Sequence, residues 1–490
     1  MSNKFPSSLG FERSNPLRHL GWFTFLVLGV MAWFFYLERT VFLDAAFQSF
    51  TVITQNKLAI QVNRFGAAVT QVFPLVAARL GWSLEGILRA YSMSFVIYPF
   101  VLLLLLTRVF RNGRMALALA LFYTLLVSQT FYWIQSELLQ GCALVFFFYG
   151  IVDACFYKDT RTLDHPFRAT AIYLLMAGLS IVIIFFHPVL FIPFFYIWLF
   201  MAISRGREKR KTFYVLPLLA VAVMLFKRYG LPANGYDTAT TGLTDGLLDR
   251  AVNFFSLQST QNLYRWCVTD YYCFPLLFAA VLVFYGWRRN FVKLAYVAGA
   301  VIAYLILVNC TFHWNVEQFY IESHYQVLTV LLVVPLVLDL LQAPRWRKVL
   351  VYLIPLVVLI RLTQIGFEHR TFTHRLDIER SMLEATKSIG GEKFMIARDD
   401  LPWGELLMTW GLPYETLYLS ALEHPDSART ILSLEGSQPF VSENAARTDA
   451  FFGPWGVQQQ QEIEATGYFR FNDTIPYRKL SQAEAFPKRN

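Results

Sequence analysis

The stretch of sequence that decides the fold is residues 20–47, LGWFTFLVLGVMAWFFYLERTVFLDAAF. Its first part, Leu20 to Leu37, is almost entirely apolar and long enough to cross the roughly 30 Å hydrocarbon core of a bilayer. Two acids, Glu38 and Asp44, follow directly. Apart from the N-terminal tail, they are the first acids of the chain. Glu38 and Asp44 are therefore the first candidates for a reaction that needs a carboxylate at the membrane surface.

The composition is typical of a membrane protein. Of the 490 residues, 56% are hydrophobic and 16% are charged, whereas about a quarter are charged in soluble domains. The net charge of +9 does not indicate nucleic-acid binding, because the basic residues collect in short loops, where a topology signal belongs. The five cysteines show no metal-ligand spacing.

The repeated apolar runs predict an all-α polytopic membrane protein with about 11 transmembrane helices. Every second loop is basic; one example is Arg205–Lys211, RGREKRK. By the positive-inside rule, the N-terminus is then cytoplasmic and the C-terminus lies outside. The predicted spans lie near 20–37, 91–107, 115–133, 138–157, 169–186, 188–204, 212–229, 271–287, 294–310, 325–341 and 349–365.

Three parts are predicted along the chain. Residues 1–19 form a cytoplasmic tail, and residues 20–365 form the membrane domain. Residues 366–490 return to the composition of soluble proteins, with a strand-like stretch at 393–397 and a helix-like one at 403–422. We expect this last part to be a small α/β extracytoplasmic domain.

Two long loops are predicted on the same side as this domain. The first, 38–90, contains apolar helix-like pieces at 42–54 and 66–80. They are too short to span a bilayer and have the character of helices that lie in its interface. The second loop, 230–270, is polar and rich in Gly, Asp and Thr at its start, which predicts a flexible flap.

Unusual polar residues are expected to collect at this one membrane surface. The membrane interior is poorer in charge, with Asp153 as its clearest charged residue. A transporter usually needs ionisable groups at mid-depth, whereas an enzyme that uses a lipid-anchored substrate needs its polar site at the interface. The candidate site residues are Glu38, Asp44, Arg64, Trp133, Glu137, His187, His313, Glu322, His324 and Arg361.

Many of these residues also allow a purely structural interpretation. Asp44 suits the N-cap of a helix over 45–54, and Arg361 can snorkel to the interface. His187 precedes a proline, as a turn residue would. Ordinary interfacial or solvated positions would account for Glu38, Glu137, His313 and His324.

The order of these features resembles the GT-C glycosyltransferases, a superfamily that includes protein O-mannosyltransferases and the aminoarabinose transferases of lipid A. The resemblance covers roughly residues 18–365. It implies an inverting enzyme of the bacterial inner membrane, with its C-terminal domain in the periplasm. Such enzymes move a sugar from a polyprenyl-phosphate carrier to a glycan, lipid or protein acceptor. The phrases Asn63–Gly66 and Glu322–His324 are also similar to multi-spanning proteins of Bacteroidota.

The resemblance also implies roles for residues. The acidic motif of the first loop matches Asp44 best and Glu38 second, and an acid of the second loop matches Glu137. Asp44 would then act as the general base on the acceptor hydroxyl or orient it, and Glu137 would share that role or hold a metal. A pair of carboxylates would be able to hold Mg²⁺ or Mn²⁺, although no metal triad is visible. The implied substrate-binding residues are Arg64, Trp133, His187, His313, Glu322, His324 and Arg361.

Two other function classes stay open at this point. A transporter or flippase for a lipid-linked sugar would use the same interface features, but should add polar groups along a path to the cytoplasm. A non-catalytic membrane scaffold subunit would tolerate the loss of Asp44 and Glu137.

Overall fold

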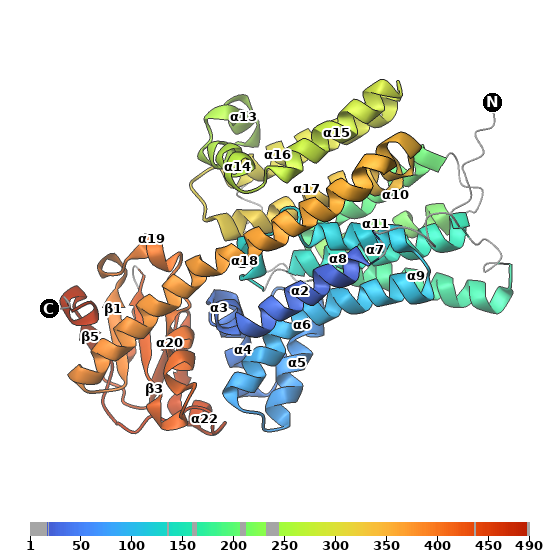
Figure 1. Cartoon of the computed structure of the whole chain (residues 1–490). Helices are drawn as coiled ribbons and strands as arrows, with labels where there is room; N and C mark the ends of the chain where they lie inside the picture. Colours follow the sequence, from blue (N-terminus) through green and yellow to red (C-terminus); the bar gives the residue numbers. More distant parts are fainter. Residues whose placement is uncertain are drawn as a thin grey trace.

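The structure is a computed structural model that describes residues 17, 19–134, 137–158, 164–205, 212–231, 245–435 and 438–487. It is mostly helical and contains two small β-sheets. Long helices form a bundle at one end of the molecule, and both sheets lie at the other end (Figure 1).

Sixteen α-helices precede residue 390 in the described part of the chain, and most of them belong to the bundle. Two of them continue as π-helical turns, η3 (Leu105–Val109) after α6 and η5 (Asp153–Lys158) after α8. The helices are α2 (Leu20–Phe34), α3 (Tyr36–Thr40), α4 (Leu43–Gln55), α5 (Ala68–Arg79), α6 (Leu84–Leu104), α7 (Gly113–Phe122), α8 (Glu137–Val152), α9 (Pro166–Phe186), α10 (Phe191–Arg205), α11 (Thr212–Tyr229), α13 (Leu247–Val252), α14 (Gln258–Thr269), α15 (Cys273–Trp287), α16 (Phe291–Thr311), α17 (Gln318–Leu338) and α18 (Pro344–Ile389).

Six helical segments of the described residues are long and apolar enough to cross a membrane. A seventh results if the bent pair α14 and α15, which meet at 90°, counts as one span. Several further apolar helices are shorter, α2 and α7 among them. The number of eleven spans therefore stays a prediction. The six segments are Leu84–Val109, Glu137–Tyr157, Pro166–Phe186, Phe291–Thr311, Gln318–Gln342 and Pro344–Ile389.

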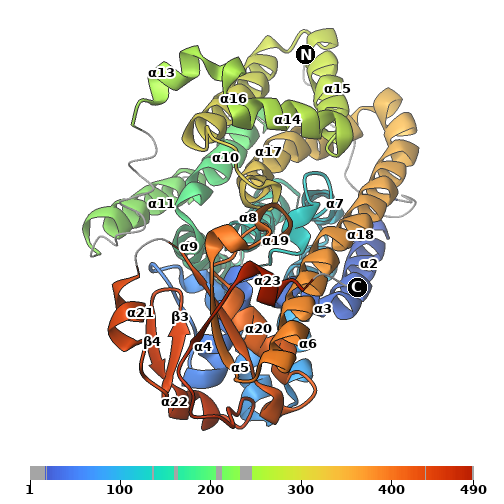
Figure 2. The ribbon, with the colours of Figure 1, turned by 90° about the vertical axis from the view of Figure 1, so that its left-hand side faces the viewer.

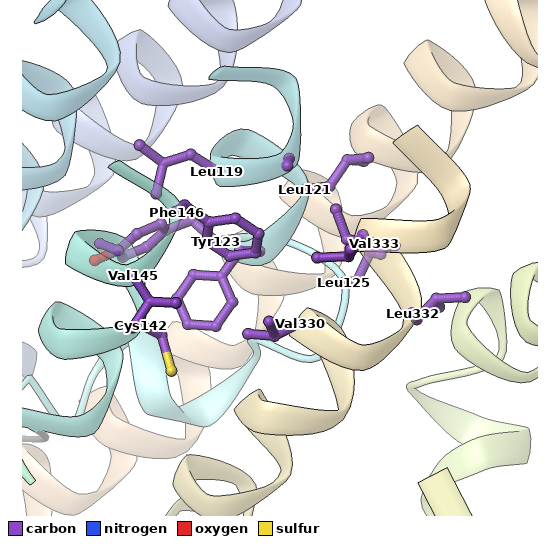
Figure 3. Packing of buried hydrophobic residues seen from close by; sticks show 14 of the residues in the cluster. Leu119, Leu121, Tyr123, Leu125, Cys142, Val145, Phe146, Val330, Leu332 and Val333 are labelled. Carbon is purple, nitrogen blue, oxygen red and sulfur yellow. The ribbon is translucent and has the colours of Figure 1, made fainter. Parts of the chain in front are cut away.

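The helices α8 and α17 occupy the centre of the bundle. Buried residues make up 94% of the apolar stretch of α8 and 89% of that of α17, but only 33% in α9 and 28% in α16. Such all-round apolar helices fit an interior position. Figure 3 shows their contact, where Cys142 and Phe146 lie near Tyr123 and Val330. The exposed apolar faces of α9 and α16 are left for lipid.

The first loop contains the two short helices that its sequence predicts. The first predicted piece, 42–54, is α4, which begins at Leu43. The second, 66–80, is the 3-10 turn η2 (Phe65–Ala67) followed by α5. Gly66 lets the turn pack closely, because a Cβ added there would lie 2.1 Å from the ring of Phe186.

The predicted span over 115–133 is helical only as far as Phe122, where α7 ends. The chain then runs as a buried loop through Trp133. Backbone groups buried in an irregular loop need partners. Here Arg361 of α18 donates to the carbonyl oxygens of Thr124 and Val127, at 3.1 and 3.0 Å. Charged side chains from other helices thus replace the hydrogen bonds of a continued helix.

The loop predicted as a flap, 230–270, is helical where it is described. Most of its Gly- and Thr-rich start, 232–244, lies outside the described residues. The rest forms α13, the 3-10 turn η8 (Phe254–Ser256) and α14.

The helix α18 runs from the bundle into the C-terminal segment without a break (Figure 1). Its 46 residues correspond to a length of about 69 Å. The expected domain boundary at 365/366 therefore falls inside one helix. Buried apolar residues continue along it, from Ile354 and Val358 in the bundle to Leu376 and Met382 beyond it.

The C-terminal segment contains two small sheets. In the first, β1 (Lys393–Ala397) lies between β2 (Thr430–Leu434) and β5 (Arg478–Leu480), all parallel, with Phe394 paired to Ile431 and Arg478. The second is the antiparallel hairpin of β3 (Ala450–Gly453) and β4 (Gly456–Gln459). The predicted strand at 393–397 is confirmed, and the helical stretch at 403–422 is two helices. The helices here are α19 (Trp403–Leu406), α20 (Leu412–Ala421), α21 (Pro439–Asn444), α22 (Gln460–Glu464) and α23 (Gln482–Ala485).

One hydrophobic cluster joins this segment to the first loop. Phe50 of α4 stacks on Phe451 of β3, with ring centroids 5.3 Å apart, and also contacts Tyr414 of α20 at 4.8 Å. Figure 2 shows α4 and α20 side by side, in agreement with their contacts. The loop that carries Asp44 is therefore packed against the C-terminal segment.

Candidate functional site

Asp44 lies in the first turn of α4, where the chain leaves the apolar helix α2 through the short helix α3. It is the second residue of the helix, and Phe42 is the N-cap, so the N-cap interpretation of Asp44 is wrong. Burial and then the charge of Glu137 raise the pKa of Asp44 from 3.8 to about 6, although the Trp133 indole and Arg64 oppose the shift. A carboxylate with this pKa is suited to act as a base near neutral pH.

Glu137 and Arg64 form an ion pair beside Asp44. Nη1 of Arg64 lies 3.3 Å from Oε2 of Glu137, and the two side chains are only 13% and 4% exposed. Glu137 is the first residue of α8, where the helix dipole favours a negative charge. Arg64 precedes the turn η2, so the loop 38–90 carries a cation to an acid of the next loop. Both carboxylates thus share one arginine.

Trp133 links this pair of acids to the aromatic start of α17. Its indole Nε1 donates to Oδ2 of Asp44 at 3.4 Å. Its ring stacks on Tyr320, with centroids 5.6 Å apart, and meets Phe319 edge-on at 5.1 Å. The buried loop after α7 therefore contributes both a donor for the acid and a flat aromatic surface next to it.

Two histidines complete the group. The rings of His187 and His324 are 6.4 Å apart, and His324 also contacts Tyr320. His187 caps the turn η7 (Pro188–Leu190), where its Nδ1 accepts the N–H of Val189 at 3.2 Å. Burial, and after it the charge of Arg64, lower the pKa of His187 well below 6.5. The ring is therefore neutral, and Nε2 carries its hydrogen.

We name these residues the Asp44 cluster. It brings together six of the ten sequence-predicted site residues, from four separate segments of the chain. Its members are Asp44, Arg64, Trp133, Glu137, His187 and His324.

Glu322 and Arg361 lie in a different, fully buried network. Glu322 accepts the N–H groups of Ser128 and Thr130 at 2.7 and 2.9 Å and the hydroxyl of Tyr271 at 2.7 Å. Arg361 pairs with Asp270 at 2.7 Å. These contacts use both side chains to hold the loop after α7. Their predicted role in substrate binding stays a prediction.

Glu38 and His313 have other partners. Glu38 accepts the hydroxyl of Thr373 of α18 at 2.9 Å. The Nδ1 of His313 lies 3.0 Å from Nη1 of Arg250 of α13, and its ring lies edge-on to Trp314. Neither residue has a contact with Asp44 in the described part of the chain.

Sequence reasoning missed three polar residues behind Asp44. The carbonyl of Gln48 accepts the hydroxyl of Tyr91 at 2.8 Å and the amide of Gln71 at 3.0 Å. All three side chains are buried. Gln48 is four residues after Asp44 and so lies on the same face of α4. This spacing is the signal that would have found it.

Arg39 was also missed, and it holds the segment that presents Trp133. It is 1% exposed, and its Nε donates to Ser92 Oγ at 2.8 Å. Its Nη1 donates to the carbonyl oxygen of Phe131, and the guanidinium lies 4.0 Å over the ring of that residue. Burial lowers the pKa of Arg39 from 12.5 to about 9. An arginine directly after Glu38 is a weak signal, because interfacial arginines are common.

The donor set of the cluster does not by itself make a cation site. The described residues contain no group of three His, Cys, Asp or Glu side chains that would hold a metal ion. The carboxylate of Glu137 is already paired with Arg64. At this place Mg²⁺ or Mn²⁺ would meet two carboxylates, Asp44 and Glu137, and would compete with the guanidinium of Arg64.

Comparison with known proteins adds no relative: no protein-family model, no curated protein and no solved structure matches this chain.

Proposed function

We propose that the protein is a membrane glycosyltransferase that moves a sugar from a polyprenyl-phosphate carrier to an extracytoplasmic glycan, lipid or protein acceptor. The observation that carries the proposal is Asp44. It is a partly buried acid with a pKa of about 6, next to a cation and neutral imidazoles, in the first turn of the helix α4. A base for a hydroxyl and donors for a phosphate are the two requirements of such a transfer.

Asp44 acts as the general base in the proposed reaction. With a pKa of about 6, most of it is ionised at pH 7, and the Trp133 indole orients it. It takes the proton of the acceptor hydroxyl as that oxygen bonds to the anomeric carbon. The bond from this carbon to the phosphate oxygen breaks on the opposite side, so the sugar configuration inverts.

The leaving polyprenyl phosphate takes both electrons of the broken bond and needs donors. Arg64 supplies a guanidinium, and neutral His187 supplies an Nε2–H. Glu137 orients Arg64 through their ion pair. The flat pair of Trp133 and Tyr320 gives a sugar ring a surface on which to lie.

The finer topology belongs to the same proposal. We place the N-terminus in the cytoplasm and the segment after 389 outside the bacterial inner membrane, because every second loop is basic. About eleven spans agree with this orientation. Alkaline phosphatase fused after residue 487 is expected to be active, and fused after Arg288 it is expected to be inactive.

The transporter alternative receives less support. Charged groups do lie inside the bundle, but Glu322 and Arg361 are occupied by the loop after α7. A path for a polar head group would need such residues to be available to it. Burial of the Asp44 carboxylate raises its pKa and costs folding free energy. A scaffold subunit would gain nothing in return for this cost.

The first test of the proposal is substitution of Asp44 by Asn and by Ala. Surface glycans and lipid-linked sugars are then profiled in cells that produce each variant. We expect a glycan to lose a sugar and its lipid-linked donor to accumulate, while the protein stays abundant.

The matched control is Asp377→Asn, which removes a 61% exposed carboxylate from α18 and should leave the profile as in wild type. The proposal is wrong if both Asp44 variants have a wild-type profile while deletion of the protein changes it. The scaffold and transporter functions would then be favoured over the glycosyltransferase.

A further inference from the structure

The first turn of α4 is held by the C-terminal segment and not by a cap of its own. Its N-cap is Phe42, whose side chain accepts no hydrogen bond. Leu43 has φ of 44°, in the left-handed region that residues other than glycine rarely adopt. Asp44 follows directly. The direction of its side chain therefore depends on what keeps Leu43 in this conformation.

Glu415 of α20 is the group that holds Leu43. Its Oε1 accepts the N–H of Leu43 at 2.5 Å, and its Oε2 accepts from Nη2 of Arg375 of α18. Arg375 also donates to the carbonyl oxygen of Val41 at 3.2 Å. Both side chains are almost fully buried, at 1% exposure or less. The two residues thus fix the backbone on both sides of Phe42.

A close approach of the two segments makes this contact possible. Gly411 precedes α20, and a Cβ added to it would lie 2.9 Å from the Cα of Leu43 and 2.3 Å from Oε1 of Glu415. Contacts this short do not occur for real Cβ atoms. Position 411 therefore has to be glycine for reasons of space.

We propose that Glu415 is a positioning residue for Asp44. It caps α4 from a segment 372 residues further along the chain and fixes the orientation in which Asp44 meets its substrate. The C-terminal segment thereby completes the site. This inference rests on the proposed function, because it concerns the base of that reaction.

An amide at position 415 cannot take over both contacts of this carboxylate. Glu415 accepts from two donors, the N–H of Leu43 and the guanidinium of Arg375, and the carboxyl group of Glu379 is its third polar neighbour. A glutamine has one acceptor oxygen, so it would serve only one of these two donors. Arg375 keeps a second carboxylate, Glu379 at 2.6 Å. We therefore expect Glu415→Gln to fold while it loses the contact with Leu43.

The test compares Glu415→Gln, Asp44→Asn and wild type by three measurements. Transfer is followed in cells by the glycan profile. Hydrogen exchange is followed in the purified protein over peptide 41–47. Binding of undecaprenyl phosphate is followed in nanodiscs. For Glu415→Gln we expect transfer to fall about tenfold or more and binding to change less than about twofold, since the residue does not touch the donor. Exchange at 41–47 should become faster, because the N–H of Leu43 loses its acceptor.

The outcomes separate this inference from the proposed function. If Glu415→Gln transfers like wild type while Asp44→Asn is inactive, the positioning role is wrong and the proposed function stands. If Asp44→Asn itself transfers like wild type, the proposed function fails and the positioning role fails with it. Glu405→Gln is the matched control, since it alters a 57% exposed acid of the same segment and should change none of the three measurements.

A second variant decides the matter if Glu415→Gln does not accumulate. Gly411→Ala leaves every charge in place, and its methyl group pushes apart the carboxylate of Glu415 and the backbone of Leu43. The same three measurements apply, with the same expected results. If neither variant accumulates, Glu415 is needed for folding and its assignment as a positioning residue is overturned.

Discussion

At the scale of single residues, Asp44 couples the stability of the fold to pH. Its pKa is about 6 in the folded protein because of burial first and Glu137 second, against an ordinary value of 3.8. The folded state therefore binds this proton more tightly than the unfolded state. Above pH 6 the ionised carboxylate is a cost to folding, and below pH 4 that cost is absent. The difference amounts to up to about 3 kcal/mol.

We predict from this that Asp44→Asn stabilises the protein at neutral pH. The gain should be up to about 3 kcal/mol at pH 7.5, should shrink between pH 6 and pH 4, and should be small at pH 4. Thermal unfolding in detergent, measured from pH 4 to pH 8, checks it. Asp377→Asn, at an exposed position, should show no such pH-dependent gain. A destabilised Asp44→Asn at pH 7.5 would mean that the ionised carboxylate is satisfied by its neighbours.

At the scale of elements, the buried loop after α7 depends on one arginine. Arg361 has no exposed surface and makes contacts with Asp270, Ser128 and the carbonyl oxygens of Thr124 and Val127. Removal of one partner of a buried ion pair leaves the other charge uncompensated, at a cost of about 3–5 kcal/mol. This loop holds Trp133 against Asp44, so loss of Arg361 should also disturb the hydrogen bond between these two residues.

We predict that Arg361→Met lowers the stability of the whole protein by about 3 kcal/mol or more. The measurement is thermal unfolding in detergent together with the amount of folded protein in membranes. Arg380→Met is the control, because Arg380 is half exposed and surface substitutions usually change stability by less than about 0.5 kcal/mol. An Arg361→Met protein that is as stable as wild type but inactive would support the role in substrate binding instead.

At the scale of the whole molecule, one hydrophobic cluster joins the first loop to the C-terminal segment. Phe50 of the first loop contacts Phe451, Phe469 and Tyr414 of the C-terminal segment. The helix α18 runs from the bundle into the C-terminal segment without a break. Neither part buries these rings without the other, so we expect them to unfold together.

The prediction is one thermal transition that Phe50→Ala and Phe451→Ala both lower. Each substitution removes a fully buried ring, which costs about 3–5 kcal/mol. Calorimetry of the full chain is the measurement. Val252→Ala, in the 86% exposed position of α13, should leave the transition where it is. Two separate transitions, each moved by only one of the variants, would contradict the shared hydrophobic cluster.

The sequence predicted the helical pieces of the first loop, the strand at 393–397 and six members of the Asp44 cluster. These follow from local patterns: apolar runs predict helices, and polar residues at the ends of apolar runs indicate one membrane surface. The segment 115–133 is not one continuous helix, for a reason that local patterns do not contain. Its apolar composition suits a helix, but Arg361 and Glu322 satisfy the backbone of an irregular loop instead.

By itself, the amino-acid sequence determined that long apolar helices dominate this protein, because hydrophobic free energy depends on composition over about 20 residues. It also determined which acids stand at the ends of those helices. Only the tertiary structure decided which of these acids share a site. Arg64 meets Glu137 across 73 residues and Glu415 meets Leu43 across 372. Contacts over such separations depend on how the helices pack, and no local pattern records that packing.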